Sequence, residues 1–109
     1  MTHVLASLQK EIHSFVIENG LNTDIRSHVL DLSSEVGELA KEILKATDYG
    51  KRSFLSTRQF EEEVGDVLFV LTRIANDAGI DLAMAIHGTL QKMKCRIEEK
   101  GHPGSDGQV

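Results

Sequence analysis

The chain has 109 residues, enough for one domain with a modest core, and its formal net charge of −5 argues against binding to a nucleic-acid polymer, which favours a basic surface. A single cysteine, Cys95, excludes an intrachain disulfide and fits a reducing compartment. Neither a signal-peptide pattern nor an apolar run long enough to span a bilayer is found, which predicts a soluble cytoplasmic protein without a membrane partner.

Apolar residues recur every three to four positions through the first half of the chain, and this period predicts two helices. The first is expected from about Val4 to Glu18, with Gly20 as its stop. The second is expected to end at about Ala46. Three residues could cap its start: Asn22, Thr23 or Asp24.

The second half of the chain carries signals for two more helices. Ser56 with Gln59 three residues later predicts a capping box for a third helix, which is expected to stop at Gly79. Asp81 is expected to cap a fourth helix, which ends at Gly101.

No segment alternates with the period of a strand, so the predicted fold class is all-α, a four-helix bundle. We expect one domain over residues 1–101 and a flexible tail over 102–109. Because every helix carries an apolar stripe and the first helix is short, the core is expected to be shared between copies of the chain in a homo-oligomer.

Two short segments of the chain nearly repeat each other. They are Glu35-Val36-Gly37-Glu38-Leu39 and Glu63-Val64-Gly65-Asp66-Val67. Each places two carboxylates three residues apart, on one face of a helix. If the two helices face each other, four carboxylates meet, and such a group repels itself unless cations lie in it. Hard cations such as Mg²⁺ prefer oxygen ligands.

The helical period also predicts how these acids lie relative to the apolar stripes. Glu63 falls inside the apolar arc of its helix and Asp66 near the edge, whereas Glu35 borders the arc of the other helix and Glu38 lies outside that arc. A single helical glutamate is usually a solvated surface residue. The repetition of both spacing and burial argues against that explanation here, because a carboxylate in an apolar arc is costly unless it is paired, protonated or metal-bound.

A glycine stands between the two acids of each segment. Gly37 and Gly65 each destabilise a helix interior by about 1 kcal/mol relative to alanine. We expect a close approach of another helix, or of a ligand, at these positions.

The rest of the chain narrows the choice of metal. No EF-hand loop is present, and the one Glu-x-x-His spacing, Glu99 to His102, contains Gly101, which should end the helix. The five histidines are scattered and do not form a zinc motif. A site made of carboxylates favours Mg²⁺, with Mn²⁺ as a substitute.

The two acid pairs and the short sequence segments around them resemble the signature of the MazG-like all-α nucleoside triphosphate pyrophosphohydrolases. The pairs are Glu35-x-x-Glu38 and Glu63-x-x-Asp66. The resemblance runs from the first helix to Gly101. It implies Mg²⁺-dependent hydrolysis of a (deoxy)nucleoside triphosphate to the monophosphate and pyrophosphate, in nucleotide-pool house-cleaning, by a homodimer or homotetramer. Two alternatives stay open: a phosphoribosyl-ATP pyrophosphohydrolase, and a non-catalytic helical module that binds a nucleotide or a protein partner.

The resemblance also implies roles for individual residues. The catalytic base that takes a proton from the attacking water would be Glu35 or Glu63. The metal ligands would be four acids: Glu35, Glu38, Glu63 and Asp66.

Three further positions of the chain bear on the substrate and the metals. Lys94 and Arg96 flank the apolar stripe of the fourth helix on opposite sides, and we expect them to bind the phosphates. Many relatives have an acid directly before the first motif glutamate, where this chain has Ser34, so the number of bound ions stays open.

Overall fold

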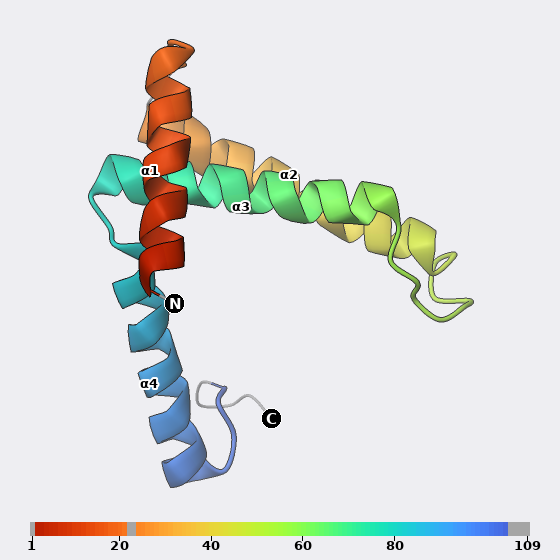
Figure 1. The fold of residues 1–109 in the computed structure, drawn as a ribbon. Coiled ribbons are helices and arrows are strands. Elements are labelled where there is room, and N and C mark those ends of the chain that lie inside the picture. Colours follow the sequence, from red (N-terminus) through yellow and green to blue (C-terminus); the bar gives the residue numbers. More distant parts are fainter. Residues whose placement is uncertain (1, 22–23, 105–109) are drawn as a thin grey trace.

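Four helices are present in the computed structural model, which describes residues 2–21 and 24–104 (Figure 1). They are α1 (Thr2–Glu18), α2 (Ile25–Ala46), α3 (Arg58–Ala78) and α4 (Leu82–Lys100). No strand occurs in these two ranges. The all-α class predicted from the sequence is therefore confirmed.

The starts of three helices are fixed by side chains that accept backbone N–H groups. Asp24 accepts from Arg26 at the start of α2, and Asp81 accepts from Met84 at the start of α4, the cap that was predicted. The other two candidate caps of α2, Asn22 and Thr23, lie outside the described residues.

The predicted capping box at Ser56 and Gln59 is wrong. Thr57 caps α3, because its hydroxyl oxygen accepts the N–H of Phe60 at 3.1 Å. Gln59 then occupies the second position of the helix instead of the third, from which a capping-box side chain would reach back to the cap. The sequence contains two neighbouring hydroxyl residues, and the second one makes the bond.

Glycines end α3 and α4 as predicted. Gly79 and Gly101 have φ of 68° and 82°, the left-handed conformation that residues with a side chain rarely adopt. In each case the glycine N–H bonds to a carbonyl of the last helical turn.

The helices do not form a closed bundle. α2 and α3 pack along each other as an antiparallel hairpin, α1 crosses α3, and α4 contacts α1 while extending away from the hairpin (Figure 1). The buried apolar side chains are few and lie where α1 meets the other helices: Ile12, Val16, Ala75 and Ala83. Most of the predicted apolar stripes, including that of α4, are exposed in this single copy.

One glutamine ties α1 to the corner between α3 and α4. The side-chain amide of Gln9 donates to Oδ1 of Asn76 and to the carbonyl of Ile80, and its oxygen accepts the N–H of Leu82. Asn76 in turn donates to the backbone carbonyl of Gln9 at 3.0 Å. We call these four residues the Gln9 clasp.

The boundary predicted at residue 101 stays a prediction, because residues 105–109 of the proposed tail lie outside the described part of the chain. Nearer the helix, Arg96 donates to the carbonyl of Pro103 at 3.2 Å. In the described ranges, no helix combines the length and the apolar character needed to cross a bilayer.

Candidate metal centre

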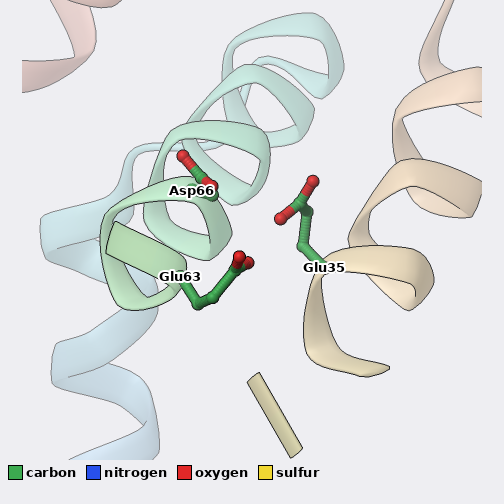
Figure 2. A group of neighbouring side chains, drawn as sticks. All are labelled: Glu35, Glu63 and Asp66. Atoms are coloured by element: carbon green, nitrogen blue, oxygen red, sulfur yellow. The ribbon is translucent and has the colours of Figure 1, made fainter. Parts of the chain in front are cut away.

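The two repeated acidic segments lie in the middle of α2 and α3, the two helices that pack along each other. Glu35 projects from α2, and Glu63 and Asp66 project from α3 into the same space (Figure 2). One carboxylate oxygen from each of the three lies within 4.8 Å of the others. We call these three residues the acidic cluster.

Exposure of the acids follows the helical period. Glu35 and Glu63 are half-buried, whereas Asp66 and Glu38 are exposed. Glu38, the fourth predicted ligand, is not part of the acidic cluster, although its charge acts on Glu63. The structure thus brings three of the four predicted ligands together, and the role of Glu38 stays a prediction.

Glu63 has the most perturbed environment of the cluster. Its partial burial raises the pKa of the carboxyl above its usual value of 4.5, and the nearby Glu35 carboxylate, then the charges of Asp66 and Glu38, raise the pKa further. Its Oε2 atom is buried without a hydrogen-bond partner. Such an oxygen is costly unless a proton or a cation satisfies it.

This donor set fits a hard divalent cation. It consists of carboxylate oxygens from three side chains, one of which is buried and unsatisfied, and no histidine or cysteine joins it among the described residues. Oxygen-only sites of this kind suit Mg²⁺ or Mn²⁺, which usually keep several waters. The arrangement can therefore hold a cation while leaving coordination positions for water and phosphate oxygens.

The glycines between the acids are not explained by helix packing within one copy. A Cβ added at Gly37 or at Gly65 would meet nothing within 4 Å. The expected close approach of another helix is therefore absent at both positions within the described residues. What remains of that expectation is a ligand or a second copy of the chain.

The two predicted phosphate-binding cations lie on a different element. Lys94 and Arg96 belong to α4, which packs on α1 and extends away from the hairpin (Figure 1). No ion pair between either side chain and the acidic cluster is found in the described part of the chain. Their role in binding phosphate stays a prediction.

Sequence reasoning missed a buried histidine that lies close to an acid near the start of the hairpin. His28 on α2 is 3% exposed, and its Nε2 lies 3.3 Å from Oδ2 of Asp77 on α3. The available signal was its position seven residues before Glu35, two helical turns away on the same side of α2. This contact joins α2 to α3, the two helices that carry the acidic cluster.

Comparisons with known proteins agree with this geometry. The family model described as the MazG nucleotide pyrophosphohydrolase domain matches residues 24–100, which include all of the acids discussed. The uncharacterized protein YpjD of Bacillus subtilis (strain 168) is 35% identical over 80 residues, which are 71% of this chain and 70% of that protein. No solved structure gives a significant match.

Proposed function

Since the chain belongs to the MazG nucleotide pyrophosphohydrolase family, we propose that it hydrolyses a (deoxy)nucleoside triphosphate to the monophosphate and pyrophosphate in the presence of Mg²⁺. The observation that carries the proposal is the acidic cluster, in which Glu63 presents a buried, unsatisfied oxygen beside two further carboxylates. A phosphate substrate could approach such a centre only with a cation present, because four like-charged groups would otherwise meet.

Each acid has a proposed part in this reaction. Glu35, Glu63 and Asp66 would hold the ion, with Glu38 one turn along α2 as the fourth ligand. A bound Mg²⁺ would offset the charge of the triphosphate and lower the pKa of a coordinated water. Either Glu35 or Glu63 would accept a proton from the attacking water, because both side chains are half-buried and their carboxylates point into the same space between α2 and α3.

Further proposals concern the surroundings of the site. Lys94 and Arg96 would bind phosphate oxygens of the substrate, and the protein would work as a homodimer or homotetramer in the cytoplasm, where it removes unwanted nucleotides. The catalytic domain would span residues 1–101, with 102–109 as a flexible tail. The large exposed apolar area of the single copy supports the oligomer.

The test is pyrophosphate release from a panel of NTPs, dNTPs, oxidised nucleotides and phosphoribosyl-ATP, with Mg²⁺ or Mn²⁺. We expect release together with the matching monophosphate, and a loss of at least about a hundredfold in Glu63→Gln. Glu61→Gln is the matched control, because Glu61 is an exposed acid on the same helix.

The outcomes separate the alternatives. Preference for phosphoribosyl-ATP would assign the protein to that reaction instead. A folded protein that binds Mg²⁺ but hydrolyses none of the panel would overturn the proposed activity and favour the non-catalytic module.

A further inference from the structure

The connection between α2 and α3, residues 47–57, is longer than the roughly two to eight residues that usually join two packed helices. It lies at the tip of the hairpin, away from α1 and α4 (Figure 1). Several of its side chains are exposed, among them Tyr49 at 71% and Leu55 at 78%. Long loops held by a rigid scaffold often carry function, so this connection is a candidate for one.

The first part of the connection holds two residues in an unusual backbone conformation. Asp48 and Tyr49 have φ of 48° and 56°, a left-handed region that a side chain as bulky as tyrosine rarely adopts. The N–H of Tyr49 bonds to the carbonyl of Leu44 at 2.7 Å. The N–H of Arg52 bonds to the carbonyl of Thr47 at 3.0 Å. These bonds hold the turn in place, and backbone strain of this kind is found mainly at functional sites.

The second part of the connection is attached to α3 beside the acidic cluster. The ring of Phe54 packs edge-on against that of Phe60, with the centroids 5.0 Å apart. Phe60 precedes Glu63 by three residues, so the two lie on one face of α3, about 4.5 Å apart along the axis. Lys51 is three residues before Phe54, which keeps their Cα atoms within about 11 Å of each other. A polyphosphate that extends from the acidic cluster toward the connection would therefore approach Lys51.

Residues 45–58 contain four basic residues and one acid. Three of the basic side chains are engaged by groups nearby: Lys45 by Glu42, Arg58 by Glu62, and Arg52 by the carbonyl of Ala46. Lys51 is exposed, and its amino group has no ion pair or hydrogen bond with any residue that the structure describes. An ammonium group in this position is suited to bind a phosphate.

The other end of the acidic cluster presents a different surface. Phe69 follows Asp66 by about one helical turn and packs edge-on against Phe15 of α1, with the centroids 6.2 Å apart. Arg73, one turn further, lies 5.9 Å from the centroid of the Phe69 ring. Aromatic rings offer no hydrogen-bond donor to a phosphate oxygen, and the arginine is stacked on one of them. The connection is therefore the better match for the phosphate end of a substrate.

We propose that Lys51 binds the phosphates that leave as pyrophosphate, so that the substrate lies along the hairpin with its phosphate end toward the connection. The inference rests on the proposed pyrophosphohydrolase activity and deepens it. In that reaction the bond between the α-phosphorus and the bridging oxygen breaks, and this oxygen leaves with pyrophosphate. The ammonium of Lys51 offsets the negative charge of this leaving group, and the turn at 47–52 holds it in position.

Binding of pyrophosphate itself tests the role of Lys51 without turnover. With Mg²⁺ present, we expect isothermal titration calorimetry to show that Lys51→Ala raises the dissociation constant of pyrophosphate at least about tenfold, because a hydrogen bond to a charged group is lost. Lys10→Ala is the matched control, since Lys10 is an exposed lysine on α1, and it should leave the dissociation constant unchanged. Far-UV circular dichroism shows whether each variant keeps its helices.

Tyr49 makes the connection directly observable. It is the one tyrosine of the chain, which contains no tryptophan, so the intrinsic fluorescence of the protein reports on this turn. We expect pyrophosphate with Mg²⁺ to change the fluorescence of the wild type beyond the effect of Mg²⁺ alone. Arg73→Ala examines the opposite orientation of the substrate and should bind pyrophosphate as the wild type does.

The outcomes separate this inference from the proposed activity. Pyrophosphate that binds without a change in tyrosine fluorescence, or whose binding is weakened by Arg73→Ala and not by Lys51→Ala, would overturn the role of Lys51 alone. A folded wild type that binds neither pyrophosphate nor an α,β-methylene nucleoside triphosphate would overturn the inference and the proposed activity together.

Discussion

Glu35 on α2 and Glu63 on α3 hold their carboxylates side by side at one point of the hairpin (Figure 2). Burial and the neighbouring Glu35 carboxylate raise the pKa of the Glu63 carboxyl, so this point of the hairpin favours a proton or a cation. The packing of α2 against α3 holds the two carboxylates at this point. We therefore expect the cluster to lower the stability of the metal-free protein, and a bound cation to offset that loss.

The first prediction concerns the stability of Glu63→Gln without metal. Burial, then the neighbouring acids, raise the pKa of Glu63 above 4.5 in the folded chain. The folded state consequently binds a proton that the unfolded state has released, and stability falls as the pH rises from 4.5 through the raised pKa. Glu63→Gln removes this loss, so in EDTA its melting temperature should exceed that of the wild type by more at neutral pH than at pH 4.5. A difference that does not change with pH would contradict the assignment.

The second prediction ranks the acids by their effect on Mg²⁺ binding. Free Mg²⁺ at about 100 times its dissociation constant should stabilise the wild type by about 2.7 kcal/mol. Glu63→Gln should abolish this gain, because Glu63 supplies the buried oxygen. Glu38→Gln should weaken binding only about ten- to a hundredfold, because Glu38 lies outside the acidic cluster. Thermal denaturation with and without Mg²⁺ measures both effects, and equal losses in the two variants would show that Glu38 is as close to the ion as Glu63.

The elements of the fold could be predicted because their signals are local. Gly79, Asp81 and Gly101 each mark a helix end through interactions within a few residues. The same is true of the acids: equal spacing in two neighbouring helices, together with helical periodicity, was enough to predict that Glu35 and Glu63 meet. Local signals failed between Ser56 and Thr57: only Ser56 has a Gln three residues later and matches the capping box, yet the hydroxyl of Thr57 makes the bond.

The course of α4 could not be predicted, because it depends on bonds between distant parts of the chain. Gln9 and Leu82 are far apart in sequence, and nothing around Gln9 marks it as different from a surface glutamine of an amphipathic helix. The apolar stripe of α4 predicted the helix, and the sequence predicted that such stripes form a core shared between copies of the chain. In the single copy that face is exposed, so the shared core stays a prediction.

The third prediction tests the Gln9 clasp. Gln9→Ala removes three hydrogen bonds and leaves the N–H of Leu82 and the side chain of Asn76 without these partners. At about 1 kcal/mol for each bond, the free energy of unfolding should fall by about 3 kcal/mol. Gln91→Ala is the control, since Gln91 is exposed on α4, and it should change stability by less than about 0.5 kcal/mol. Urea denaturation of both variants makes the comparison, and similar midpoints would show that the clasp does not hold the corner.

The fourth prediction concerns the contact between the buried His28 on α2 and Asp77 on α3. Asp77→Ala removes the carboxylate that lies 3.3 Å from His28 and leaves an imidazole that is 3% exposed without that partner. The loss should be about 1 kcal/mol, because neither imidazole nitrogen has a hydrogen-bond partner among the described residues and the change removes the one polar contact found there for this side chain. Asp31→Ala, at an exposed acid of α2, should have little effect. Because the two side chains act together, adding His28→Ala to Asp77→Ala should cost less than the sum of the single changes, and a double-mutant cycle in urea measures this coupling. Strict additivity would mean that His28 and Asp77 are neighbours without a shared contribution, and that apolar packing alone sets the alignment of Glu35 with Glu63.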